Sequence, residues 1–199
     1  MTAAFQYGAS GQAFVDGFAF EGRAILMNDS ILEVASAASI TDRIRALAAE
    51  IAAAYEGREL TVFGVQEDSF MFLADLLRAL PRPVRTSFLK YDHQTLAGVQ
   101  DISFATQTDL IGRDVLLVEA VLDTGVTQEY LMRQLDARGA RSVKLCVLVD
   151  KPNRRRVELQ PDWRALETQA DYVFGYGLGF QDRWRELPYL ATFEGQEKS

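Results

Sequence analysis

The feature that most constrains the fold of this chain is the segment 115–127, an apolar run that leads through acidic residues into a glycine and hydroxyl turn. A second continuous apolar run covers residues 143–149, and residues 128–138 between the two have the pattern of a helix. Continuous apolar runs are typical of strands buried on both faces of a parallel sheet. The sequence therefore predicts an α/β protein in which helices flank a mostly parallel sheet in three layers.

Strand and helix patterns also alternate before this segment. Residues 60–65 predict a strand, residues 70–80 predict the helix after it, and residues 84–90 predict another strand. An earlier helix is predicted from a capping pattern at residues 39–42, running towards Tyr55 with apolar residues at steps of three and four. Ligands of such sheets bind at the carboxyl ends of the strands.

Two segments show no regular period. Residues 91–108 are polar and predict a long mobile loop, with room for a short hairpin, of the kind that often serves as a lid. Residues 1–23 mix glycine with aromatic residues and are interpreted as an N-terminal extension whose role is unreadable. Residues 24–199 are interpreted as a single domain, because a chain of 199 residues that is 48% hydrophobic is long enough to bury one substantial core.

The overall composition narrows the class of partner. The formal charge of -7 argues against a nucleic-acid partner, since the only evident basic run is 154–156. No apolar stretch reaches membrane-spanning length, and no basic residue precedes Arg23, so neither a membrane anchor nor a secretory signal is predicted. The single cysteine, Cys146, lies in an apolar run and predicts a buried thiol in a reducing compartment. These features favour a cytoplasmic protein with a small-molecule ligand.

The turn at residues 123–127 has the chemistry of a phosphate-binding loop. Backbone amides of a tight turn, the hydroxyls of Thr124 and Thr127, and the positive end of the following helix dipole all point to one place. Taken alone, this turn also fits an ordinary connection from a strand to a helix. The pattern of the whole chain favours the phosphate-binding interpretation.

This segment resembles the phosphoribosyl-pyrophosphate motif of type I phosphoribosyltransferases, and the chain resembles the hypoxanthine-guanine branch of that family. The matching segments, in the same order along the chain, are 60–65, 70–76, 115–127, 148–152 and 173–178, followed by Arg185, Leu187, Pro188 and Tyr189. The resemblance implies a type I phosphoribosyltransferase fold with a small hood. It also implies a purine nucleotide or phosphoribosyl pyrophosphate as ligand, Mg2+ as cofactor, and a homodimer or homotetramer.

The resemblance also implies a role for each of several residues. These are Asp123 as the acid/base group beside the purine N7; Asp123, Thr124, Gly125, Val126 and Thr127 around a 5'-phosphate; Glu119 at the ribose hydroxyls and the metal; Lys151 at the exocyclic oxygen of a 6-oxopurine; Val173 and Phe174 around the base; and Glu67, Asp68 and Arg185 in the pyrophosphate region. Without the resemblance, Lys151 and Arg185 would be interpreted as surface charges.

Four sites depart from the family pattern. A lysine-glycine pair is replaced by Glu67 and Asp68, the second residue of an acidic pair by Ala120, and a magnesium-binding aspartate by Gly179. The mobile loop reads Leu-Lys-Tyr-Asp at residues 89–92 in place of a serine-tyrosine pair. All four changes concern pyrophosphate, metal or loop closure, whereas the phosphate and base positions are kept.

Three functions are therefore compatible with the sequence. The first is a transferase that moves phosphoribosyl from phosphoribosyl pyrophosphate to hypoxanthine or guanine, with weak activity. The second is a catalytically silent homologue that binds a purine nucleoside monophosphate as a sensor or regulatory module. The third is an enzyme with an altered substrate, in which the acidic loop meets a neutral or cationic group.

Overall fold

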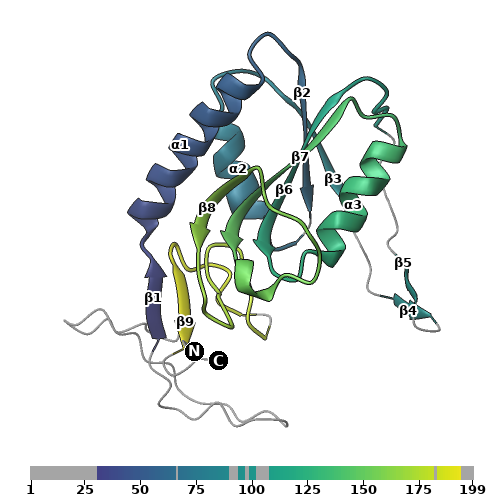
Figure 1. The fold of residues 1–199 in the computed structure, drawn as a ribbon. Coiled ribbons are helices and arrows are strands. Elements are labelled where there is room, and N and C mark those ends of the chain that lie inside the picture. The colour runs from purple at the N-terminus through teal and green to yellow at the C-terminus, as the bar shows by residue number, and fades with distance from the viewer. Residues whose placement is uncertain are drawn as a thin grey trace, which may run out of the picture.

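The computed structural model describes residues 31–65, 67–89, 94–96, 99–101, 108–181 and 183–193. Its centre is a five-stranded sheet with all neighbouring strands parallel, in the order β3-β2-β6-β7-β8 (Figure 1). The strands are β2 (Leu60–Val65), β3 (Arg85–Leu89), β6 (Asp114–Leu122), β7 (Ser142–Asp150) and β8 (Trp163–Glu167). The predicted parallel sheet is confirmed, and every residue of β2 is buried, as expected for a strand covered on both faces.

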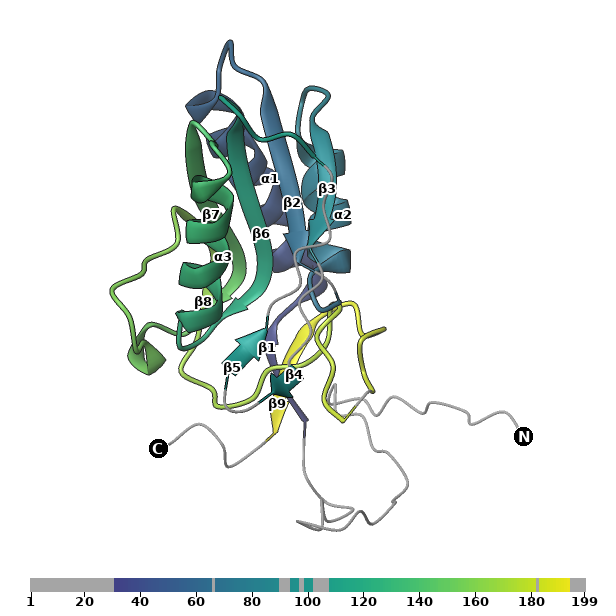
Figure 2. The same ribbon diagram turned by 90° about the vertical axis from the view of Figure 1, so that its right-hand side faces the viewer.

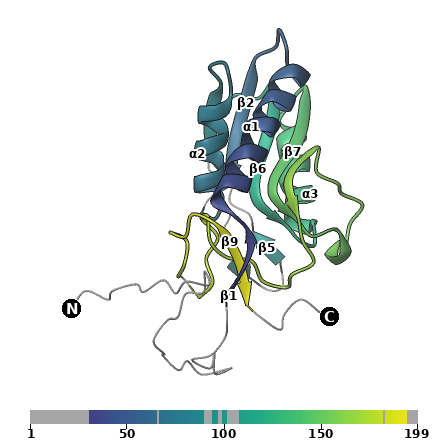
Figure 3. The same ribbon diagram turned by 90° about the vertical axis from the view of Figure 1, so that its left-hand side faces the viewer.

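Helices cover both faces of this sheet. One face carries α1 (Ala37–Ala54) and α2 (Phe70–Ala79), and the other carries α3 (Val126–Ala137), as Figures 2 and 3 show from two sides. Each face has its own apolar core: Leu76 of α2 belongs to the first, and Leu131 of α3 to the second. A methyl group at Gly64 would overlap the side chain of Leu73, so this glycine lets α2 approach the sheet closely. The predicted three-layer architecture is confirmed.

The predicted start of the first helix is wrong. The helix begins at Ala37, and its cap is Ser36, whose Oγ atom accepts a hydrogen bond of 3.2 Å from the amide of Ser39. Two alanines directly after this serine are strong helix formers, and they extend the helix by one turn before residues 39–42, where the sequence predicts the cap. Ser39 therefore lies in the first turn and does not cap the helix.

A small second layer lies at the carboxyl ends of the sheet strands. There β1 (Ile31–Ala35) and β9 (Leu190–Phe193) pair antiparallel (Figure 1). Phe174, Ala191 and Phe193 form the centre of its own apolar cluster. This layer corresponds to the expected hood, and it places the ends of the described chain beside the edge where the site is expected.

The segment predicted as a lid contains a short antiparallel hairpin, β4 (Gln94–Leu96) with β5 (Val99–Asp101). The possible hairpin is thus confirmed, while the remainder of residues 90–107 lies outside the described residues. The N-terminal extension at residues 1–23 also lies outside them, so the domain boundary at residue 24 stays a prediction. Among the helices that the structure describes, none is both long and apolar enough to cross a membrane.

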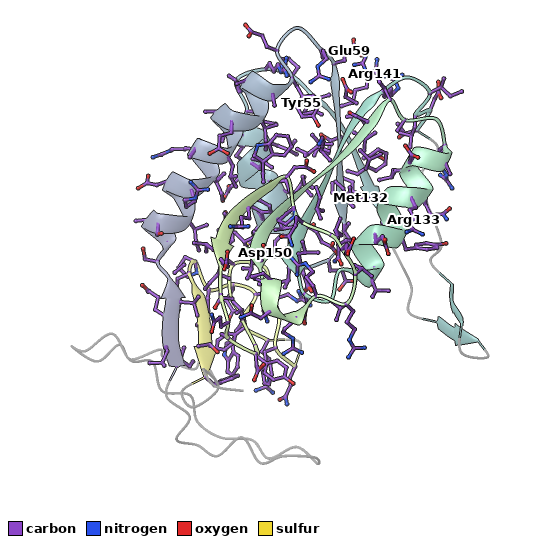
Figure 4. The ribbon with its side chains drawn as sticks, viewed as in Figure 1. Tyr55, Glu59, Met132, Arg133, Arg141 and Asp150 are labelled. Carbon is purple, nitrogen blue, oxygen red and sulfur yellow. The ribbon has the colours of Figure 1, made fainter. Side chains whose placement is uncertain are left out.

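The amino ends of the strands are held by one buried carboxylate, that of Asp114. It accepts hydrogen bonds from Nε of Arg141 at 3.1 Å, from Oγ of Ser142 at 2.6 Å and from Nη1 of Arg58 at 3.3 Å. These bonds, first the one from Arg141, lower the pKa of Asp114. In Figure 4 Tyr55, Glu59 and Arg141 mark this end, and Asp150 lies near the opposite end. The ion pairs of Asp114 and the candidate site are therefore at opposite ends of the sheet strands.

Candidate active site

The turn between β6 and α3 has the backbone shape that a phosphate-binding loop requires. Gly125 precedes the helix with a φ of 83°, in the left-handed region that favours glycine. A Cβ atom at this residue would lie 2.9 Å from Cγ2 of Val157, so the position has neither the backbone freedom nor the space for a side chain. The first amides of α3 have no partner within the helix and carry the positive end of its dipole. Anions bind readily at such a place.

A pocket of about 280 Å³ opens beside this turn. Five residues predicted for the site line it, and the structure brings them together from three segments: Asp68, Glu119, Asp123, Thr124 and Thr127. Gly125 and Val126 form the turn itself. The other predicted site residues do not line this pocket: Glu67, Lys151, Val173, Phe174 and Arg185. Two of them interact with residues that do, since Arg185 is bonded to Asp68 and Lys151 lies near the charge of Asp123.

Glu119 is a buried residue of the pocket lining, and its neighbour Gln128 is not a site residue predicted from the sequence. Nε2 of Gln128, from the first turn of α3, donates to Oε2 of Glu119 at 2.5 Å. Burial raises the pKa of Glu119 to about 7, the hydrogen bond from Gln128 acts against that shift, and the charge of Asp68 adds to it. Close to neutral pH this carboxyl group is therefore divided between its charged and neutral forms.

Asp123 rests in an ion pair. Nε of Arg154 lies 2.8 Å from Oδ1 of Asp123, and Nη1 of the same arginine lies 2.8 Å from Oδ1 of Asp171. Oδ1 of Asp123 is buried and makes no hydrogen bond within the described part of the chain, so the ion pair is what compensates this atom. Arg154 thereby connects the phosphate loop to the segment that precedes Val173.

Arg155 binds the backbone at the start of the phosphate loop, the turn at residues 123–127. Its guanidinium donates to the backbone carbonyls of Leu122, Asp123 and Lys151 and pairs with the buried carboxylate of Asp150. These bonds join the carboxyl ends of β6 and β7. In the sequence the run 154–156 is only a short basic stretch. The signal that could have indicated Arg154 and Arg155 is the run of three arginines a short distance after a predicted central strand.

Lys151, which the sequence predicts at the base, is buried directly after β7. Nζ of Lys151 donates to the backbone carbonyl of Asp171 at 2.8 Å. Burial lowers the pKa of this lysine, while the nearby charge of Asp123 acts against that shift. A buried ammonium group next to a strand end is suited to donate to a carbonyl oxygen of a ligand.

The expectation for Phe174 does not agree with the structure. Its side chain is 0% exposed and packs between Trp184 and Phe193, with ring centroids 4.9 Å and 4.7 Å away. It therefore has no free face for a purine. Tyr172, two residues earlier, is 53% exposed and contacts Phe180 edge to face. Val173 between them is half-buried. Tyr172 is thus the aromatic ring of this segment that is available for stacking.

Two of the three residues expected in the pyrophosphate region, Asp68 and Arg185, are paired with each other. The carboxylate of Asp68 accepts a charge-assisted hydrogen bond from Nη1 of Arg185, which also donates to the carbonyl of Gly177 at 2.7 Å. Glu67, beside Asp68, is exposed and makes no ion pair with any residue that the structure describes. Arg185 is thus already paired with a carboxylate of the protein itself.

The predicted metal site offers few ligands among the described residues. Within those residues, no group of three or more histidine, cysteine, aspartate or glutamate side chains is placed to hold a metal ion. The one carboxylate predicted for the metal, Glu119, is buried and bonded to Gln128. Mg2+ commonly takes one or two carboxylates and completes its shell with water and substrate phosphates. A metal here would have to take most of its ligands from the substrate.

Comparison with known proteins identifies the class to which this fold and pocket belong. A sequence profile of the phosphoribosyl transferase domain matches residues 30–183. The hypoxanthine-guanine phosphoribosyltransferase of Mycobacterium avium is 36% identical over 169 residues, which is 80% of this chain and 83% of that protein. The bifunctional protein TilS/HprT of Listeria monocytogenes is 33% identical over 181 residues, 87% of this chain but only 27% of that protein's length.

Solved structures agree with these sequence relatives. A hypoxanthine phosphoribosyltransferase from Staphylococcus aureus superimposes with a TM-score of 0.77 at 26% identity, covering 82% of this chain and 93% of that one. The Trypanosoma cruzi hypoxanthine phosphoribosyltransferase in complex with the product IMP has a TM-score of 0.74 at 32% identity, covering 81% and 89%. The chain belongs to the phosphoribosyltransferase family and has its type I fold. Within that family it is a member of the hypoxanthine-guanine branch.

Proposed function

We propose that this protein transfers a phosphoribosyl group from phosphoribosyl pyrophosphate to hypoxanthine or guanine. In this reaction a bond forms between the anomeric carbon of ribose and a purine ring nitrogen, and the bond from that carbon to the pyrophosphate oxygen breaks. The pocket that combines the phosphate loop with Asp123, next to Lys151, is the observation that carries the proposal. Branch membership supports the choice of a 6-oxopurine.

Each group then has a proposed task. The amides of residues 125–127 and the hydroxyls of Thr124 and Thr127 hold the 5'-phosphate. Asp123 accepts the proton that leaves the purine as the new bond forms, since its carboxylate is part of the pocket wall. Lys151 donates to the exocyclic oxygen of the base, and Tyr172 stacks on the ring. Glu119 is the proposed contact for ribose hydroxyls.

We propose that Mg2+ binds together with the substrate and not as a resident ion of the protein. When present it would neutralise the charge of the diphosphate, and the protein residues described here perform the remaining tasks. This assignment rests on the branch of the family and on the lack of a carboxylate cluster within the described residues.

A second candidate function is a silent nucleotide-binding module. The observation that favours it is the pairing of site residues with one another, Asp68 with Arg185 and Glu119 with Gln128. Such a protein would bind a purine nucleoside monophosphate through the same phosphate loop without catalysing the formation of that nucleotide.

A product assay separates the two candidates. The protein is incubated with phosphoribosyl pyrophosphate and Mg2+ together with hypoxanthine, guanine or adenine, and nucleoside monophosphate is measured by chromatography. We expect product from the two 6-oxopurines and none above background from adenine, because Lys151 has a hydrogen to donate and an amino group does not accept it. Binding of the monophosphate without any product would support the silent module. Equal rates with adenine would contradict the role given to Lys151.

A further inference from the structure

The pocket beside the phosphate loop is lined by two segments of opposite character. One is the turn 124–127, whose amides, hydroxyls and helix dipole attract an anion. The other is the loop after β2, from which Asp68 and Ser69 line the pocket, so a carboxylate is part of its wall. Glu119, a further lining residue, adds no positive charge. A ligand with a single anionic group suits this pocket, whereas a ligand with a second anionic group near Asp68 meets a carboxylate.

Asp68 is held in place by contacts with the segment that carries Arg185. The guanidinium of Arg185 donates to the Asp68 carboxylate and to the Gly177 carbonyl. A Cβ atom at Gly177 would lie 2.8 Å from the backbone oxygen of Asp68, so the two segments are in close contact. A Cβ atom at Gly179 would lie 2.8 Å from Cζ of Arg185. The absence of a side chain at residue 179 is therefore what allows the guanidinium to lie in its present place.

These contacts link two departures from the family pattern that are far apart in the sequence. Asp68 supplies the carboxylate, and Gly179 supplies the space in which Arg185 reaches it. The pair is partly exposed, with 54% of the Asp68 side chain and 32% of the Arg185 side chain accessible. Solvent and external anions can therefore reach it. An anionic ligand has to displace the carboxylate of the protein before it gains the guanidinium.

We propose that Asp68 is a specificity-determining residue that occupies Arg185 and so makes the pocket select ligands with one phosphate over ligands with a second anionic group. This inference rests on the proposed function, since it assigns a preference to the same pocket. The favoured class is a purine nucleoside monophosphate, and the disfavoured class is a phosphoribosyl diphosphate. Arg185 is the residue through which Asp68 acts, so the effect requires both side chains.

Equilibrium titration calorimetry of the full chain tests the proposal. Inosine monophosphate and phosphoribosyl pyrophosphate with Mg2+ are titrated separately, without purine base, into the wild type, Asp68→Asn, Glu67→Gln, Arg185→Gln and the Asp68→Asn/Arg185→Gln double variant. Glu67→Gln is the matched control, because it removes the same charge from the adjacent exposed residue, which has no ion pair among the described residues. All substitutions are at accessible positions.

We expect Asp68→Asn to tighten phosphoribosyl pyrophosphate binding by about tenfold, and to change inosine monophosphate binding by less than about twofold. Glu67→Gln should give a gain of no more than about threefold, and so should Asp68→Asn in the Arg185→Gln background. Equal gains from Asp68→Asn and Glu67→Gln, or an unchanged gain without Arg185, would overturn the inference and leave the proposed function standing. If inosine monophosphate bound to none of the proteins, the proposed function itself would fail.

Discussion

Nε of Arg154 lies 2.8 Å from Oδ1 of Asp123, so the proposed proton acceptor of the reaction is held by an arginine that also reaches Asp171. This places one side chain between the phosphate loop and the segment around Val173. The two halves of the proposed site are thereby fixed relative to one another. Positioning of this kind contributes to rate because small displacements of a catalytic group are costly.

Arg154→Gln is expected to lower kcat about tenfold to a hundredfold with a smaller effect on binding of the monophosphate, because the buried oxygen of Asp123 loses its partner. Steady-state kinetics with hypoxanthine would measure this. Arg156→Gln is the control, since Arg156 is exposed and its side chain makes no ion pair within the described residues. Equal losses from the two substitutions would show that net charge matters and that the Asp123 ion pair does not.

The buried carboxyl group of Glu119 should make folding stability depend on pH. Its folded pKa of about 7 lies above the ordinary value of 4.5, so folding favours the protonated form. This contribution is fully present below the unfolded pKa and is lost as pH rises through the folded pKa. The free energy of unfolding should therefore fall by up to about 3 kcal/mol between about pH 5 and about pH 8.

Glu119→Gln removes the titrating group, so its unfolding free energy should change less over this interval than that of the wild type. Urea denaturation at both pH values measures the difference. Glu158→Gln, at an exposed residue, should behave as the wild type does. Parallel pH profiles for wild type and Glu119→Gln would contradict the assignment.

The sequence could predict those parts of the fold whose pattern is local and strong. The strand at residues 60–65 has the bounds that were predicted, because its six residues are all buried and read as one apolar run. In contrast, β8 has one buried residue among four that are partly or fully exposed, so its sequence carries little signal. The strands β1 and β9 pair across most of the chain, and no local pattern indicates such a contact.

Site residues were predictable where a motif fixes the backbone. The turn at Gly125 lies where the motif predicts it, because a strand, a left-handed glycine and a helix leave few alternatives. Phe174, predicted at the base, is buried, whereas Tyr172 two residues earlier is exposed and is the ring proposed for stacking. The ion pairs of Arg154, Arg155 and Arg185 join segments that only the folded chain brings together. Charge alone in the sequence does not indicate which partner an arginine takes.

Gly125→Ala should damage the phosphate site more than an equivalent change elsewhere. Residue 125 has a left-handed backbone, which a methyl group disfavours, and the new methyl group also meets Val157. We therefore expect monophosphate affinity to fall at least about tenfold and stability to fall by about 1–2 kcal/mol. Gly57→Ala is the matched control, because Gly57 has a φ of 70° and nothing within 4 Å of its Cβ position. It should lose a similar amount of backbone stability and keep its affinity. Retained affinity in Gly125→Ala would contradict the phosphate loop.

Tyr172 and Phe174 should respond oppositely to substitution by alanine. Tyr172→Ala removes an exposed ring, so the KM for the purine should rise about tenfold with little change in stability, as stacking on a base is worth about 1–3 kcal/mol. Phe174→Ala opens a cavity in the aromatic cluster and should cost about 3–5 kcal/mol of stability. Kinetics and thermal unfolding together check both. An unchanged KM in Tyr172→Ala would exclude Tyr172 from base binding.

In the proposed reaction, one pocket both holds the 5'-phosphate and moves a proton through Asp123. The most direct test compares wild type with Asp123→Asn, a change that keeps the size of the side chain and removes its basicity. Inosine monophosphate affinity is measured by calorimetry, and the rate of its formation from hypoxanthine and phosphoribosyl pyrophosphate is measured by chromatography. We predict a rate at least about a hundredfold lower with affinity changed less than about threefold, as expected when a general base is lost but the phosphate loop stays intact. An unchanged rate in Asp123→Asn would contradict the role of Asp123 as the proton acceptor.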